Sequence, residues 1–370
     1  MTGNSVPGNT VPGNTGQPDT DRAAAAAAAA ADSAADSAAD TAADTAAADG
    51  GLSLDRIRAA AARLSGVAHR TPLLTSAGLD RRCGGTIVLK AEPFQRSGSF
   101  KFRGAYNRLS QLDADERARG VVAYSSGNHG GAVALAAAML GIPAVVVVPA
   151  TGSAAKLAAI EGYGAQLRRY DPASESREEV AAALARARSL TLIRPFDDYE
   201  IMAGQGTLGI ELAEQAGELD LVLVPVGGGG LAAGVATAAA ALLPTTAVIG
   251  VEPAGADDTQ RSLRAGHRVS LAAPDTMADG LLASQPGELT FPINRALLEE
   301  VVTVPEAAIV AAMRFCFTRL KLVVEPSGAV PLAALLSGAV QASGRRTAVV
   351  LSGGNIDPAD FAALLSNNEL

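Results

Sequence analysis

The stretch Leu221-Val222-Leu223-Val224-Pro225-Val226-Gly227-Gly228-Gly229-Gly230-Leu231 joins an apolar run to four consecutive glycines and then to an alanine-rich segment. A continuous apolar run is typical of a strand buried on both faces, as in parallel sheets covered by helices. Glycines leave their amides free of Cβ clashes, so that with the start of the next helix they can surround a phosphate dianion. The stretch lacks the lysine of a P-loop and the spacing of a dinucleotide fold. It therefore predicts an anion site made by the backbone alone, and a merely flexible turn is implausible at this place.

Short β-branched runs alternate with alanine-rich helical stretches from about Leu54 onward. The expected strands are 86–90, 121–124, 144–148, 166–170, 191–195, 221–226, 247–251, 301–304 and 347–351. This alternation predicts an α/β fold with mostly parallel sheets covered by helices. Ligands bind at the carboxyl ends of strands in such sheets, so the residues directly after these runs are the candidates for a site.

The bulk composition excludes several classes of protein. The 370 residues are 48% hydrophobic and 18% charged, which is typical of a chain that forms a core. A net charge of −8 and a pI near 5.1 argue against nucleic acid or an anionic membrane as partner. Cys83 and Cys316 form no metal-spaced pair and no disulfide framework. With no run of ~18 apolar residues and no signal-peptide pattern, the sequence predicts a cytoplasmic protein.

Residues 1–50 form a low-complexity tail. The pentapeptide at 4–8 is echoed at 9–13, and alanine follows with aspartates at 32, 36, 40 and 44. Four-residue spacing would place these carboxylates on one helical face, where they repel one another. We predict a mobile, partly helical acidic tail with a solubility or spacer role, and a partner-binding helix is the alternative.

Lys101 lies in the stretch Ser97-Gly98-Ser99-Phe100-Lys101-Phe102-Arg103-Gly104, after the strand at 86–90. Ser99 is expected to cap a helix that begins at Phe100, which places Lys101 in the first turn. The positive end of the helix dipole disfavours a charged amine there, as a nucleophilic lysine requires. The alternative is an ordinary exposed lysine.

The strand at 121–124 is followed by Ser125-Ser126-Gly127-Asn128-His129-Gly130-Gly131. Small residues before a helix expose backbone amides, and an amino acid's carboxylate fits such a nest. Ser126 adds a hydroxyl and Asn128 an amide. The alternative is an ordinary glycine-rich turn, and His129 alone is predicted to be a structural hydrogen-bonding residue.

Two further strand ends carry candidate groups. The strand at 347–351 leads into Ser352-Gly353-Gly354-Asn355, where the Ser352 hydroxyl could meet a ring nitrogen. The strand at 247–251 leads into Glu252-Pro253-Ala254-Gly255-Ala256-Asp257-Asp258. Its carboxylates and an intervening carbonyl could supply hard oxygen ligands to Mg²⁺ or Ca²⁺, although most acidic loops are solvated surface.

In this order, the stretches resemble those of the fold-type-II enzymes that use pyridoxal 5′-phosphate (PLP), specifically the serine/threonine dehydratase and serine racemase branch. The likeness runs from Thr71-Pro72-Leu73-Leu74 to Ile356 and includes Ala203-Gly204-Gln205-Gly206-Thr207, Ala278-Asp279-Gly280 and Leu320-Lys321-Leu322-Val323-Val324-Glu325-Pro326. The resemblance implies a two-domain architecture similar to that of tryptophan synthase β. The large PLP-binding domain would cover 51–112 and 199–370, the small domain would cover 113–198, and the chain would form a homodimer.

The resemblance also assigns roles to the candidate residues. It implies that Lys101 carries PLP with Phe100 beside the ring, that Asn128 contacts the ring 3-oxygen and that Ser352 contacts the ring nitrogen. The phosphate would be held by Gly227, Gly228, Gly229, Gly230 and Leu231. Ser126 matches the racemase serine on the face opposite the lysine, where many threonine dehydratases have alanine. The racemases' divalent-cation ligands fall on Glu252, the carbonyl of Ala256 and Asp258, which makes Mg²⁺ or Ca²⁺ an expected second cofactor.

The implied activity is an ammonia-lyase reaction on a small β-hydroxy amino acid. Lys101 would remove the α-proton, the β-hydroxyl would leave as water, and L-threonine or L-serine would give 2-oxobutanoate or pyruvate plus ammonia. The alternatives are serine racemase, alone or combined with lyase activity, and threo-3-hydroxyaspartate ammonia-lyase. Gly131 and Ala283 depart from the family pattern, which has glutamine and, in racemases, serine there, so the substrate stays open. A PLP-binding protein without catalysis is disfavoured because both Lys101 and Ser126 are retained.

Overall fold

The structure is a computed structural model that describes residues 1, 3–5 and 51–366. Almost all of the tail expected over 1–50 lies outside the described residues, so its helical character stays a prediction. In the described ranges no helix is long and apolar enough to cross a membrane, as the sequence indicated. The cytoplasmic location stays a prediction.

Residues 51–366 contain two sheets, and the larger one has six strands in the order β1-β2-β10-β7-β8-β9. Every neighbouring pair is parallel except β1 with β2, which is antiparallel. The strand bounds are β1 Leu73–Thr75, β2 Thr86–Ala91, β7 Leu221–Pro225, β8 Ala247–Pro253, β9 Glu300–Val304 and β10 Arg346–Leu351. We call this sheet and its helices the large lobe.

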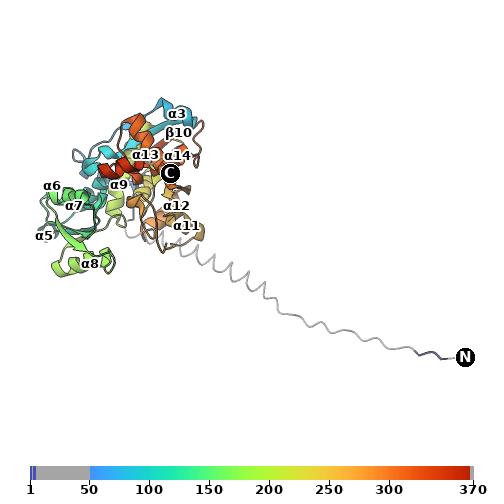
Figure 1. The fold of residues 1–370 in the computed structure, drawn as a ribbon, viewed down its shortest axis with the longest axis horizontal. Coiled ribbons are helices and arrows are strands. Elements are labelled where there is room, and N and C mark those ends of the chain that lie inside the picture. Colours follow the sequence, from blue (N-terminus) through green and yellow to red (C-terminus); the bar gives the residue numbers. More distant parts are fainter. Residues whose placement is uncertain (2, 6–50, 367–370) are drawn as a thin grey trace. The chain divides into compact units, whose positions relative to one another are not determined.

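The smaller sheet has four parallel strands in the order β5-β4-β3-β6. The bounds are β3 Val121–Tyr124, β4 Ala144–Pro149, β5 Gln166–Tyr170 and β6 Thr191–Ile193. We call this sheet and its helices the small lobe, and its α5, α6, α7 and α8 form the green part of Figure 1. The boundaries predicted at 112/113 and 198/199 stay predictions, although each sheet takes its strands from its own side of them.

Helices cover both faces of each sheet. The α-helices are α2 Leu54–Leu64, α3 Ala77–Cys83, α4 Lys101–Ser110, α5 Ala114–Arg119, α6 Asn128–Leu140, α7 Ala154–Gly162, α8 Arg177–Arg188, α9 Tyr199–Ala216, α10 Gly230–Leu242, α11 Asp258–Ala265, α12 Thr290–Leu297, α13 Glu306–Phe315, α14 Pro326–Ser337 and α15 Pro358–Ser366. In the large lobe α14 packs on β7, β8, β9 and β10, and α10 packs on β7 and β8. In the small lobe α6 and α8 both pack on β3 and β4.

The cores show why the apolar runs form buried strands. In β4, Val146 and Val148 belong to one apolar cluster, and Val145 and Val147 belong to another. Successive side chains of a strand point to opposite faces, so a run without polar residues requires cover on both sides. Every strand expected from the sequence is present with its ends shifted by at most two residues. The sequence did not reveal β1, a three-residue edge strand with only partly buried or exposed side chains.

Candidate active site

Lys101 is the first residue of α4, which follows β2 after two short 3₁₀ turns. Its Nζ donates to the carbonyl of Pro195 at 2.8 Å and lies 5.2 Å from the centre of the Phe100 ring. Burial of the amine lowers the pKa of Lys101 to about 8. The lysine that the sequence selected is therefore shifted towards the neutral form that a nucleophile or base needs.

Lys101 also differs from the other three lysines of the chain. Each of the others has a carboxylate partner or lies exposed: Lys90 pairs with Glu211 at 2.5 Å, Lys156 pairs with Asp279 at 2.6 Å, and the exposed Lys321 donates to the carbonyl of Thr318 at 2.7 Å. Lys101 is partly buried and has no carboxylate within ion-pair distance in the described part of the chain. An amine that is desolvated without a counter-charge costs folding free energy, which is common at functional sites.

The local start of α4 differs from the prediction. The cap position is Phe100 with no side-chain cap, and the buried Oγ of Ser99 has no hydrogen-bond partner, so the prediction that Ser99 caps the helix is wrong. Ser99 instead forms an isolated bridge with Gly353, and the Phe100 amide donates to the Ser352 carbonyl at 3.0 Å. These backbone contacts fix the residues before Lys101 directly to the end of β10.

A network of buried ion pairs fixes α4 to the elements around it. Arg103, two residues after Lys101, is 1% exposed and donates to Glu92 at 2.8 and 2.9 Å and to Glu211 at 2.6 Å. Glu211 in turn pairs with Lys90 of β2. Buried charges are tolerated when they are paired and hydrogen-bonded in this way. The network ties α4 to β2 and α9 and so fixes the position of Lys101.

The turn after β3 lies close to Lys101. His129 is buried, and burial followed by the charge of Lys101 lowers the pKa of His129 to about 3. Its Nε2 lies 3.1 Å from the carbonyl of Ile193, which agrees with the structural role expected for this histidine. The amides of Asn128, His129 and Gly130 donate no hydrogen bond within the described residues. The partly buried Ser126 hydroxyl is likewise without a partner there.

Two residues orient Asn128, although the sequence predicted no role for either of them. Asn128 Nδ2 donates to Glu325 Oε1 at 2.5 Å, and Asn128 Oδ1 accepts from Asn355 Nδ2 at 2.7 Å. Asn355 also donates to the carbonyl of Ser97 at 2.7 Å. Burial, followed by the charge of Asp279, raises the pKa of Glu325 to about 8. The network joins the small-lobe turn to two loops of the large lobe, and only the motifs containing Glu325 and Asn355 were visible in the sequence.

The glycine run forms the turn between β7 and α10, as expected. The amides from Gly227 to Leu231 donate no hydrogen bond to any described residue, and Gly229 has a φ of 90°. The structure adds a second reason for glycine, because a Cβ on Gly228 would lie 2.3 Å from the Phe196 ring. Ser352 is 3% exposed at the end of β10, the strand that pairs with β7. Unpaired amides at a helix N-terminus fit a phosphate group.

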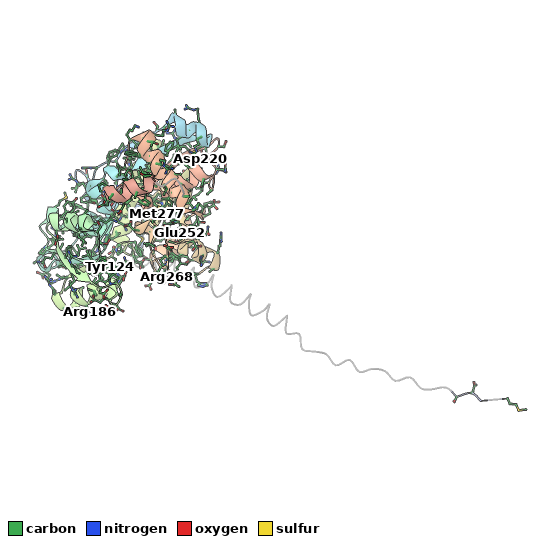
Figure 2. The ribbon with its side chains drawn as sticks, in the orientation of Figure 1. Tyr124, Arg186, Asp220, Glu252, Arg268 and Met277 are labelled. Carbon is green, nitrogen blue, oxygen red and sulfur yellow. The ribbon has the colours of Figure 1, made fainter. Side chains whose placement is uncertain are left out.

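The predicted metal ligands gather at the end of β8 and the start of α11, and Figure 2 shows Glu252 within the large lobe. Glu252 and Asp258 are both fully buried, and Asp258 has no partner for either carboxylate oxygen. Glu252 accepts from the amides of Thr259 and Gln260 at 3.0 and 2.9 Å. Burial, followed by the charge of Asp258, raises the pKa of Glu252 to about 8, and burial raises the pKa of Asp258 to about 7.

No group of three or more His, Cys, Asp and Glu side chains that could hold a metal occurs in the described part of the chain. The predicted set is smaller, because it has two carboxylates and takes its third oxygen from the carbonyl of the buried Ala256. Two buried carboxylates near each other require a proton or a cation. The donor set fits Mg²⁺ or Ca²⁺, and the site stays a prediction.

The groups around Lys101 match the needs of pyridoxal phosphate: an amine without a carboxylate partner in the described residues, free amides for a phosphate and the buried Ser352 hydroxyl. Residues 64–353 match the family described as pyridoxal-phosphate dependent enzymes, and this chain belongs to that family. Its fold is that of the fold-type-II branch, whose known structures include serine racemases and threonine deaminases.

Similar proteins narrow the class further. The L-threo-3-hydroxyaspartate ammonia-lyase of Pseudomonas sp. is 45% identical over 306 residues, which cover 83% of this chain and 96% of that one. The serine racemase of Arabidopsis thaliana is 44% identical, covering 81% and 92%. Maize serine racemase superposes with a TM-score of 0.81 at 41% identity, covering 85% of this chain and 97% of that one. A threonine deaminase from T.th. has a TM-score of 0.78 at 48% identity, covering 82% and 99%. The protein is thus a PLP-dependent enzyme of the lyase and racemase group, and the homodimer stays a prediction.

Proposed function

We propose that this protein is an ammonia-lyase that converts L-threonine, L-serine or both to 2-oxobutanoate or pyruvate plus ammonia. The observation that carries the proposal is the partly buried Lys101 amine without a counter-charge, beside a turn that presents free amides and a serine hydroxyl. Two relatives favour wider activity: a hydroxyaspartate ammonia-lyase at 45% identity and a serine racemase at 44%. Threo-3-hydroxyaspartate and racemisation of serine are therefore the second candidates.

In this proposal the chain's own residues bind and orient the substrate and move its protons. The amides of Asn128, His129 and Gly130 bind the α-carboxylate, since they point from a helix N-terminus and have no other partner among the described residues. Lys101, in the neutral form towards which burial shifts its amine, removes the α-proton. When bound, the cofactor disperses the negative charge that this removal creates. Ser126, on the opposite face, can exchange a proton there, and Glu325 with Asn355 holds Asn128 in place.

We expect the holoenzyme to release one 2-oxo acid and one ammonia for each L-serine or L-threonine consumed. The test is a single substrate panel of L-serine, L-threonine, L-threo-3-hydroxyaspartate and D-serine. Pyruvate, 2-oxobutanoate, oxaloacetate and D-serine are the products measured. A holoenzyme that shows the absorption of bound cofactor but yields no 2-oxo acid from any L-substrate would exclude the lyase function. D-serine as the main product from L-serine would favour the racemase instead.

We also expect a chelator to lower the melting temperature and Mg²⁺ or Ca²⁺ to restore it. The reason is that Asp258 is buried with both oxygens unpartnered beside the buried Glu252. A cation at ~100-fold excess over its Kd, bound only by the folded state, stabilises by ~2.7 kcal/mol. Asp258→Asn, which keeps the shape and removes the charge, should abolish the cation response. Superimposable melting curves of metal-free protein with and without cation would argue against this site.

A further inference from the structure

A three-residue segment after β6 contacts both the lysine and the glycine run. The carbonyl of Pro195 accepts a hydrogen bond from the Lys101 amine at 2.8 Å. The Phe196 ring lies against Gly228, where an added Cβ would approach it to 2.3 Å. Asp197 comes next, and none of the sequence motifs includes it. The end of the small sheet thus reaches the two parts of the site that belong to the large lobe.

Asp197 directs its carboxylate at the start of α12, about ninety residues further along the chain. One oxygen accepts from the Leu289 amide at 2.9 Å and the Thr290 amide at 3.4 Å, and the other accepts from the Glu288 amide at 3.1 Å. A Cβ on Gly287 would lie 2.3 Å from Asp197 Oδ1, so a larger residue there would displace this carboxylate. The first amides of a helix lack intrahelical partners, so a carboxylate at this place stabilises the beginning of α12.

The beginning of α12 in turn holds the glycine run. Thr290 Oγ1 donates to the carbonyl of Gly228 at 2.7 Å, and Asn294 Nδ2 donates to the carbonyl of Gly229 at 3.1 Å. In a trans peptide unit the carbonyl and the N–H of the next residue point in opposite directions. A hydrogen bond that fixes the carbonyl therefore also fixes the direction of that N–H. These two bonds therefore orient the amides of Gly229 and Gly230, which have no partner among the described residues. The α12 amides neutralise part of the charge of Asp197, and this reduces its repulsion of a nearby anion.

We propose that Asp197 is a positioning residue for the phosphate of the cofactor: it fixes the start of α12, whose Thr290 and Asn294 hold the Gly228 and Gly229 carbonyls so that the amides of the glycine run face the phosphate. The inference rests on the proposed use of this run as the phosphate site. It does not depend on which amino acid the enzyme converts.

The test compares the affinity of the apoenzyme for PLP with its affinity for pyridoxal, which has the same aldehyde but no phosphate. In Asp197→Asn the ratio of the two affinities should fall by about tenfold, the range expected when a hydrogen bond to a charged group is weakened. Thr290→Val, which keeps the side-chain shape and removes the donor, should lower the same ratio. Because Asp197 acts in part through the Thr290 hydrogen bond, the double variant should lose less than the product of the two single losses.

Asp198→Asn is the matched control. Asp198 caps α9 through the amides of Glu200 and Ile201 and pairs with Arg108 at 3.2 Å. Among the described residues, none of its side-chain hydrogen bonds or ion pairs reaches α12. The Asp198→Asn variant should leave the ratio of PLP affinity to pyridoxal affinity unchanged, even if it changes the melting temperature. The proposal is overturned if Asp197→Asn changes both affinities by the same factor or changes neither. A wild type that binds pyridoxal as tightly as PLP would overturn it together with the phosphate site, while the substrate panel would still decide the lyase function.

Discussion

The Lys101→Ala variant is expected to lose all turnover of hydroxy amino acids and the visible absorption of lysine-bound cofactor. Lys101 has a carbonyl as its only hydrogen-bond partner in the described residues, and burial lowers its pKa to about 8. The remaining lysines are held by carboxylates or lie exposed. Lys101 is thus the one lysine of the described residues that is desolvated without a counter-charge. An absorbance spectrum and the product assay on the same preparation measure both losses.

Lys321→Ala is the control for this prediction, because Lys321 is exposed and bonded only to the carbonyl of Thr318 among the described residues. It should keep both the absorption band and the turnover. The apo form of Lys101→Ala should melt no lower than the apo wild type, since the variant removes a desolvated amine that has no counter-charge in the described residues. A variant that lost Lys101 and still showed the band would prove that another residue carries the cofactor.

Strand positions were the part of the fold that could be predicted best. The run 144–148 predicted a strand covered on both faces, and Val145 and Val146 do lie in opposite cores. That pattern is local, so it can be read without knowledge of the neighbours. The candidate motifs were predicted for a similar reason, because they follow strands whose parallel packing brings their carboxyl ends to one edge of a sheet.

The contacts that hold the site residues in position could not be predicted, because they join residues far apart in sequence. Asp197 meets Leu289 across 92 positions, and Asn128 meets Glu325 across 197. Neither contact leaves a periodicity or a spacing that a single sequence displays. For Ser99 the error was the reverse, because the sequence predicted a local contact that the structure does not contain. Its residue type is typical of a helix cap, but the bridge to Gly353 holds its backbone and leaves its hydroxyl without a partner in the described part of the chain.

Ser126→Ala is expected to separate the reactions of L- and D-amino acids. Ser126 follows β3 of the small sheet, whereas Lys101 follows β2 of the large one, so we infer that they approach the substrate from opposite faces. Elimination from an L-amino acid needs only the lysine face, towards which the α-proton points. Racemisation, or attack on a D-amino acid, needs a proton donor or acceptor on the other face. The variant should therefore lose formation and breakdown of D-serine and keep its L-directed lyase activity.

The expected loss is large, because a single positioned proton-transfer group contributes ~10²–10⁴-fold. The measurement is the ratio of D-directed to L-directed rates, which cancels differences in cofactor loading between preparations. Ser125→Ala is the matched control: the Ser125 hydroxyl accepts from the Gly127 amide at 3.2 Å, so its loss can disturb the turn but should leave the ratio unchanged. Equal loss of both rates in Ser126→Ala would mean that Ser126 holds the substrate or the cofactor. A wild type without D-activity and a variant with unchanged L-activity would remove Ser126 from the mechanism and leave a lyase that works from the Lys101 face alone.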